Sequence, residues 1–133
     1  MAERLDTLDM FGAAAALPEQ VDVARRSARQ VDGLPSADGV TSVVVLGMGG
    51  SGIAGDLVAA VCGPRLAVPV IVPKGYEAPA FVGPDTLVFA VSFSGNTEET
   101  VEAATRVAER GGRLVVIAAG GELASLAGEW GAP

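Results

Sequence analysis

The fold of this chain is decided by the stretch Val43-Val44-Val45-Leu46-Gly47-Met48-Gly49-Gly50-Ser51-Gly52. A run of apolar residues leads into a glycine-rich loop, and a helix-like apolar segment follows it at residues 53–58. The start of a helix exposes unpaired N–H groups, and glycines let the backbone approach an oxygen-rich anion closely. The stretch therefore predicts a strand, an anion-binding loop and a helix, in that order.

A second stretch has the same arrangement: Leu87-Val88-Phe89-Ala90-Val91-Ser92-Phe93-Ser94-Gly95-Asn96-Thr97. One interpretation is a simple helix cap, in which Asn96 or Thr97 caps the helix that follows. That interpretation leaves Ser92 and Ser94 unexplained, because both lie at the carboxyl end of a strand, where open α/β sheets bind their ligands. Two such loops on one sheet predict a phosphate-bearing ligand that is held from two sides.

The rest of the chain alternates apolar strand-like runs with helix-like segments, which indicates a doubly wound parallel sheet. The expected strands are residues 42–47, 68–73, 86–92 and 113–119. The expected helices are residues 3–16, 51–62 and 97–110, one from Pro18 to Gly33, and one that begins near Glu122. The strand runs are continuous, as in strands that are buried on both faces. Tyr76 and Phe81 are expected to pin the long connection 73–85. The predicted fold class is a three-layer α/β/α domain with a parallel sheet.

Composition restricts the function. The chain has 133 residues, a formal net charge of −7 and no histidine, and half of its residues are hydrophobic. The length fits a single domain, and the negative charge argues against nucleic-acid and anionic-membrane partners. The only cysteine, Cys62, excludes an internal disulfide and is expected to be a buried small hydrophobe. With no apolar run long enough to span a membrane and no basic flank ahead of an apolar N-terminal run, a cytoplasmic protein is expected.

The first loop also fits a dinucleotide-binding fingerprint. Gly47, Gly49 and Gly52 have the G-x-G-x-x-G spacing. A nicotinamide cofactor normally requires an acidic residue at the end of the second strand, whereas this chain has Lys74 there, which suits only a 2′-phosphate. The loop lacks the G-K-[ST] ending of a nucleoside-triphosphate P-loop, which excludes that class. An NAD(P)-binding domain stays an alternative at this point.

Taken together, the two loops resemble a sugar isomerase (SIS) domain. The resemblance is closest to the first domain of the bifunctional phosphoglucose/phosphomannose isomerases. It extends over nearly the whole chain, and further matches are Leu17-Pro18-Glu19-Gln20, Tyr76 with Pro79, Phe81-Val82, and Gly120-Gly121 with Leu123. The resemblance implies a single SIS-type domain over residues 1–133, with residues 1–39 as N-terminal helices that pack on it.

The resemblance also implies roles for individual residues. The phosphate would be bound in the second loop by Ser92, Ser94 and Thr97, together with Gly95 and Asn96. The sugar would be contacted by Gly49, Gly50 and Ser51. Neither a cofactor nor a metal is implied. The family's catalytic glutamate, histidine and lysine lie in a second domain, and an arginine of the site follows shortly after the position of Pro133.

The implied activity is the interconversion of glucose 6-phosphate or mannose 6-phosphate with fructose 6-phosphate. This chain would supply the phosphate anchor and be inactive alone. The sequence ends in an apparent turn, where such a sheet normally adds one more strand, so a fragment of a longer protein is expected. An open sheet edge favours association, and we expect a homodimer. A regulatory SIS module that senses sugar phosphates is the second functional alternative.

Overall fold

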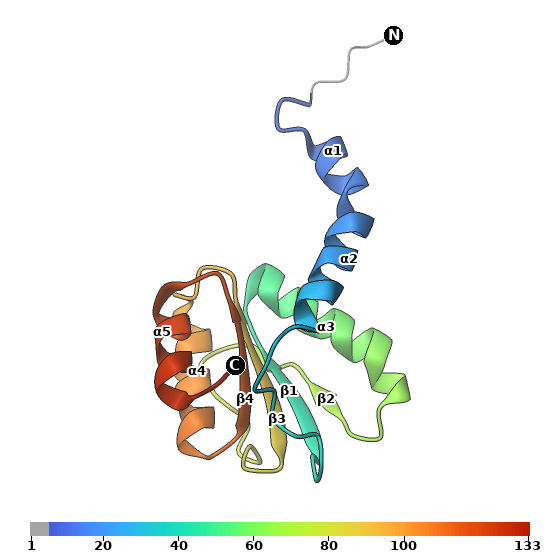
Figure 1. Cartoon of the computed structure of the whole chain (residues 1–133). Coiled ribbons are helices and arrows are strands. Elements are labelled where there is room, and N and C mark those ends of the chain that lie inside the picture. The colour runs from blue at the N-terminus through green and yellow to red at the C-terminus, as the bar shows by residue number, and fades with distance from the viewer. Residues whose placement is uncertain (1–5) are drawn as a thin grey trace. The chain divides into compact units, whose positions relative to one another are not determined.

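The structure, a computed structural model, describes residues 6–133 (Figure 1). It contains two compact units, one that ends at Asp32 and one that spans Gly33–Pro133. The N-terminal unit holds α1 (Met10–Ala15) and α2 (Leu17–Ala28). The helix that was predicted for residues 3–16 is thus shorter, and its first residues lie outside the described part. The helix predicted from Pro18 to Gly33 ends at Ala28.

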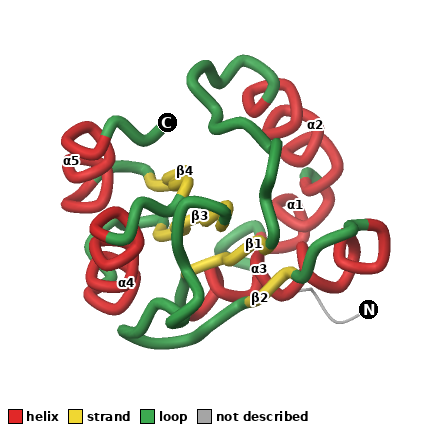
Figure 2. The backbone as a smooth tube through the Cα atoms, turned by 90° about the horizontal axis from the view of Figure 1, so that it is seen from below, coloured by secondary structure: helices red, strands yellow, loops and turns green. Residues whose placement is uncertain are grey.

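Residues 33–133 form the expected α/β unit around a four-stranded sheet. Its strands are β1 (Ser42–Leu46), β2 (Val70–Ile71), β3 (Thr86–Ser92) and β4 (Arg113–Ala118). All neighbouring strands are parallel, in the order β2-β1-β3-β4. Figure 2 shows the helices of this unit arranged around the strands. The parallel sheet confirms the predicted fold class.

Helices cover the two faces of this sheet. One face carries α3 (Gly49–Cys62), which is followed by a short 3-10 turn, Gly63–Arg65. The other face carries α4 (Glu98–Glu109) and α5 (Gly121–Trp130). Gly55 brings α3 close to the sheet, because a Cβ atom there would lie 2.9 Å from a methyl carbon of Val45. Burial of apolar surface between these layers supplies the main driving force for folding.

The core lies between the sheet and the pair α4 and α5. Its buried members come from strands, helices and one connection: Val44, Leu46, Ala78, Val82, Val88, Ala90, Ala103, Ala104, Val107, Leu114 and Leu123. All five residues of β1 are buried, as predicted for a strand that is covered on both faces. In β3, burial alternates, so that Leu87, Phe89 and Val91 are only half-buried. The prediction of burial on both faces therefore holds for β1 and fails for β2, for one face of β3 and for part of β4, where Ile117 is exposed.

Two predictions about side chains need correction. Tyr76 and Phe81, which were expected to pin the connection 73–85, are both exposed, and only a hydrogen bond from the hydroxyl of Tyr76 to Glu98 is found between these two side chains and α4 in the described chain. The smaller Ala78 and Val82 are buried there instead, because they fit against the closely packed residues of α4 and β3. Cys62 is exposed as well, at the last turn of α3.

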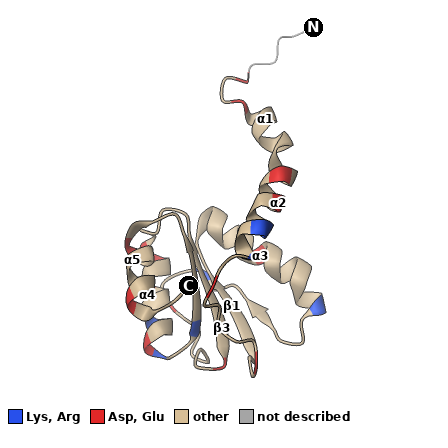
Figure 3. Ribbon diagram, viewed as in Figure 1, with Lys and Arg blue, Asp and Glu red and all other residues tan. Residues whose placement is uncertain are grey.

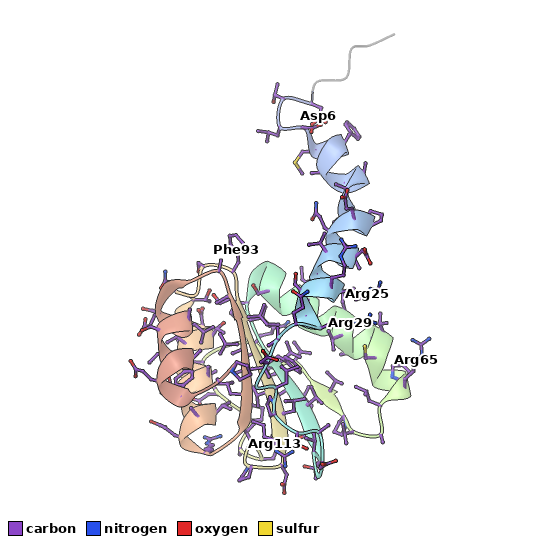
Figure 4. The ribbon with its side chains drawn as sticks, viewed as in Figure 1. Asp6, Arg25, Arg29, Arg65, Phe93 and Arg113 are labelled. Atoms are coloured by element: carbon purple, nitrogen blue, oxygen red, sulfur yellow. The ribbon has the colours of Figure 1, made fainter. Side chains whose placement is uncertain are left out.

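Arg113 organises the opposite end of the unit, away from the glycine-rich loops. Its guanidinium donates hydrogen bonds to the carbonyl oxygens of Ser36 and Asp38 at 2.6 and 2.7 Å. It also donates to the carbonyl oxygen of Pro84 at 2.8 Å. Figure 4 places Arg113 at one end of the sheet and Phe93, in the second loop, at the other. The carboxyl ends of the strands lie at the other end of the sheet from Arg113, and the candidate site is found there.

Candidate functional site

The two predicted loops leave the sheet side by side. β1 and β3 are parallel neighbours, and Leu46 at the end of β1 is paired with Ala90 in β3. Gly47 begins the first loop in close contact with the second strand, since a Cβ atom there would lie 3.0 Å from the carbonyl oxygen of Val91. Open parallel sheets bind ligands at such a point, where adjacent strands lead to helices on opposite faces.

The first loop runs directly into α3. Met48 is the extended residue that precedes the helix, and within the described chain it makes no side-chain cap hydrogen bond. Gly49 has a φ of 53°, a conformation that favours glycine. The first turn is held from outside by Lys74, whose Nζ donates to the carbonyl oxygen of Gly52 at 2.8 Å and to Oδ2 of Asp56 at 3.2 Å. Because no side chain in the described chain caps this helix start, its first amide groups are available to an anion.

The second loop is ordered by its own hydroxyl groups. The Oγ of Ser92 lies 2.9 Å from Oγ1 of Thr97 and accepts a hydrogen bond from the amide of Gly95 at 3.1 Å. The Oγ of Ser94 accepts from the amide of Asn96 at 3.2 Å. Ser92 is buried, whereas Ser94 is exposed at the surface. Ser92 thus shapes the loop from inside, and Ser94 presents its hydroxyl to solvent.

A third segment, the turn between β4 and α5, braces the second loop. The carbonyl oxygen of Gly95 accepts from the amide of Leu123 at 2.9 Å, and that of Phe93 accepts from the amide of Ala119 at 3.1 Å. The side chain of Asn96 joins this contact, because its Oδ1 accepts from the amide of Glu122 at 3.0 Å. Sequence reasoning assigned Asn96 to the ligand and did not identify this contact.

The loop and the turn approach each other so closely that two glycines are required. Gly95 has a φ of 71°, and a Cβ atom on it would lie 1.7 Å from the carbonyl oxygen of Gly120. Gly121 has a φ of 73°, and a Cβ atom there would lie 2.4 Å from the carbonyl oxygen of Ser94. Both the backbone conformation and the space exclude larger residues.

A cavity of about 520 Å³ lies beside the two loops. Its lining is mostly apolar and comprises Met48, Gly50, Ser51, Ala54, Val91, Phe93, Ile117, Ala118 and Ala119. Of the predicted sugar contacts, Gly50 and Ser51 reach this cavity and Gly49 does not line it. Of the second loop, only Phe93 lines it, and its side chain is 84% exposed. The apolar wall of the cavity was not predicted, because apolar residues at half-buried strand ends cannot be distinguished in the sequence from residues of the core.

The surroundings of the site are acidic. Glu98 and Glu99 occupy the first turn of α4, and Figure 3 shows further acidic residues on α4 and α5. The hydroxyl of Tyr76 donates to Oε2 of Glu98 at 3.4 Å. The pKa of Tyr76 is raised above its ordinary value of 10.0, first by the negative charge of Glu99 and then by desolvation and Glu98. No lysine or arginine lines the cavity in the described part of the chain. An anion would therefore be held by amides and hydroxyls.

One buried group at the start of α4 has no partner. Thr100 is 1% exposed, and its hydroxyl makes no hydrogen bond to any residue that the structure describes. In contrast, the hydroxyl of Thr105 one turn later donates to the carbonyl oxygen of Val101 at 2.9 Å. An unsatisfied buried hydroxyl is unfavourable for stability.

Between residues 6 and 133 there is no group of three or more Cys, Asp or Glu side chains that is placed to hold a metal ion. Over the same residues, none of the helices combines the length and the apolar character that crossing a membrane requires.

Comparison with known proteins identifies the family. The family model of the SIS domain matches residues 39–129, which include β1 to β4 and both loops. This chain belongs to the SIS domain family. The resemblance that was stated from the two motifs is thereby confirmed.

Relatives of this SIS chain include bifunctional phosphoglucose/phosphomannose isomerases. The protein of that name from Caldicellulosiruptor bescii is 37% identical over 118 residues, which are 89% of this chain and 35% of the relative. The one from Thermoplasma acidophilum is 42% identical over 86 residues, 65% of this chain and 27% of the relative. The chain thus spans about a third of the length of these relatives.

The fold is also found among solved structures. A structure described as a phosphosugar isomerase from Bacillus subtilis matches 65% of this SIS chain and 28% of its own chain, with a TM-score of 0.57 and 26% identity. The similarity supports the α/β fold of this chain and a relationship to phosphosugar isomerases.

Proposed function

We propose that this SIS chain binds a sugar phosphate at the carboxyl edge of its sheet. The phosphate is bound by the second loop, with Ser94, Gly95, Asn96 and Thr97 and with the buried Ser92, which shapes the loop, and the sugar is contacted by Gly49, Gly50 and Ser51. The observation that carries the proposal is the meeting of two helix-starting loops at one sheet edge, beside a cavity of about 520 Å³. The names of the relatives support phosphosugars as the ligand class.

The phosphate is held without a cationic side chain. The start of α4 contributes the positive end of the helix dipole and amide groups, because Thr97 makes no side-chain cap hydrogen bond among the described residues. Ser94 adds an exposed hydroxyl, which accepts a hydrogen bond from the amide of Asn96 and can donate its own hydrogen to a phosphate oxygen. Hydrogen bonds to a charged group contribute about 1.5–3 kcal/mol each, so a few of them support binding in the micromolar to millimolar range.

The proposed reaction is the interconversion of glucose 6-phosphate or mannose 6-phosphate with fructose 6-phosphate. That reaction moves a proton between C1 and C2 of the sugar, which requires an acid/base group. The chain has no histidine, and the carboxylates that directly follow the second loop, Glu98 and Glu99, are in the first turn of α4. A glutamate there complements the helix dipole. We therefore propose that this chain anchors the substrate and is inactive alone.

Partners and location also belong to the proposal. β4 is an edge strand of six residues that is paired with a strand on one side only, which leaves this edge of the sheet for association. We propose that two copies of the chain associate. We also propose that the protein acts in the cytoplasm, where metabolic phosphosugars are found. The packing of residues 1–39 on the domain stays a prediction.

The alternative of NAD(P) binding is less well supported by the geometry. Lys74, the residue that would have to receive a 2′-phosphate, is already bonded to the carbonyl oxygen of Gly52 and to Asp56. A regulatory SIS module would use the same phosphate loop. It differs from the isomerase because the whole protein would bind the sugar phosphate without converting it.

Calorimetric titration of the chain with fructose 6-phosphate, in parallel with NAD(H), tests the proposal. Saturable binding of fructose 6-phosphate that Ser94→Ala weakens by about tenfold is the expected result, since one hydrogen bond to a charged group is lost. Ser125→Ala, an exposed serine on α5, is the matched control and should bind normally. Binding of NAD(H) without binding of the sugar phosphate would overturn the proposal.

A further inference from the structure

Asn96 lies in the phosphate loop, but its side chain is bonded to a different element. Its Oδ1 accepts a hydrogen bond of 3.0 Å from the amide of Glu122, which is 26 residues away in the sequence. Glu122 is the second residue of α5, so its amide is one of those that a helix leaves without an internal acceptor. The carboxamide oxygen of Asn96 therefore caps α5.

The contact is part of a larger latch, which we define as the loop residues Gly95 and Asn96 together with the α5 residues Glu122 and Leu123. Its second bond runs from the amide of Leu123 to the carbonyl oxygen of Gly95 at 2.9 Å. Leu123 itself is fully buried in the core, which fixes the α5 side of the latch. The latch thus connects the second loop to a helix that is packed against the core.

The latch reaches the groups that are proposed to bind phosphate. The backbone amide of Asn96 donates to Oγ of Ser94 at 3.2 Å. Because Oδ1 of the same residue is fixed by Glu122, the amide and the hydroxyl that it orients are fixed with it. A site that binds an anion with uncharged donors depends on having those donors oriented before the ligand arrives.

We propose that the side chain of Asn96 is a positioning group, which acts on phosphate binding through the amide of Glu122 and not through its own contact with the ligand. The inference rests on the proposed function. It predicts that removing either partner of the hydrogen bond has the same effect on the affinity for a sugar phosphate, although Glu122 is not a residue of the phosphate loop.

A double-mutant cycle on fructose 6-phosphate binding tests this. Asn96→Ala removes the acceptor, Glu122→Pro removes the donor, and the double variant removes both. Proline is tolerated in the first turn of a helix, where its missing N–H breaks no internal bond. Glu122→Ala is the matched control, because it deletes the carboxylate and keeps the amide. Dissociation constants are measured well below the unfolding temperature of every variant.

The expected result is a weakening of about threefold to tenfold for each single variant, with the double variant no weaker than either one, because both remove one shared interaction. Glu122→Ala should not weaken binding, because it keeps the amide and removes only a negative charge. A role in stability alone would lower the unfolding temperature and leave the dissociation constant of the folded protein unchanged, which would overturn the inference.

Two other outcomes would contradict it. If Asn96→Ala weakens binding and Glu122→Pro does not, Asn96 contacts the phosphate directly. If the unsubstituted chain does not bind fructose 6-phosphate, the proposed function fails and the inference fails with it.

Should Glu122→Pro not fold, amide hydrogen exchange in the unsubstituted chain tests the inference instead. Fructose 6-phosphate should slow exchange at Glu122, and unchanged exchange there, with slowing at Ser94 and Thr97, would overturn the inference.

Discussion

The hydroxyl oxygens of Ser92 and Thr97 lie 2.9 Å apart, across the turn that joins β3 to α4. The same Ser92 oxygen accepts from the amide of Gly95, and its side chain is almost completely buried. The buried serine therefore defines the shape of the loop, while the rim of the loop is left to Ser94 and the amides of α4.

Ser92→Ala is expected to destabilise the chain by about 1–2 kcal/mol, because it removes the partner of two polar groups in a buried place. Denaturant unfolding measures this change. Ser125→Ala is the control, since Ser125 is exposed on α5 and alanine favours helix there. If Ser92→Ala were as stable as the control, the contact with Thr97 and Gly95 would contribute nothing to the fold.

Gly95→Ala is expected to cost at least about 2 kcal/mol, because the new Cβ meets the carbonyl oxygen of Gly120 and the backbone has a positive φ. Gly128→Ala serves as the opposite case, because it lies in α5 with no atom within 4 Å of the added carbon. It should stabilise by about 0.5–1 kcal/mol. Thermal unfolding of the two variants reports both effects, and equal unfolding temperatures would contradict this account of the loop.

Thr100→Val is expected to raise the free energy of unfolding by about 1 kcal/mol. The substitution replaces a buried hydroxyl that has no partner in residues 6–133 with a methyl group of similar size. Thr105→Val should not give this gain, because the hydroxyl of Thr105 is bonded to Val101. A loss of stability in Thr100→Val, measured by denaturant unfolding, would mean that the hydroxyl is satisfied in solution.

The ionisation of Tyr76, the only tyrosine of the chain, should report the acidic start of α4. Its pKa in the folded chain is expected above 10.0, and Glu99→Gln should lower it, since Glu99 is the main cause of the shift. The folded state then holds the tyrosine proton more tightly than the unfolded state. The resulting contribution to stability is present below pH 10 and is lost as the pH rises through the folded pKa.

Absorbance titration of tyrosinate measures this pKa directly, with Glu109→Gln at the far end of α4 as the control. An identical pKa in the unsubstituted chain and in Glu99→Gln would contradict the placement of these two side chains.

Much of the fold could be predicted because the strands have a strong local pattern. The run 86–92 is found as β3 with the predicted bounds, and 113–119 differs from β4 by one residue. The prediction for 68–73 was much longer than the two-residue β2, because β2 is an edge strand whose apolar residues pack beyond the ladder of hydrogen bonds. Residue periodicity does not report how far pairing extends.

The candidate site could be predicted only where its chemistry is local. The order of Ser92, Ser94 and Thr97 is visible in the sequence, and so are the helix starts that follow both loops. The bond from Asn96 to Glu122 could not be predicted, because it joins segments that only the fold brings together. The same holds for the apolar wall of the cavity, to which Ile117 contributes from β4.

The central claim is that the loop between β3 and α4 binds a sugar phosphate, and backbone amide shifts on titration with fructose 6-phosphate test it most directly. We predict saturable shifts that are largest from Ser94 to Glu98, with a second group from Gly49 to Ser51. Inorganic phosphate should shift mainly the first group. Saturable shifts that are confined to other parts of the chain, or no shifts at all, would contradict the account.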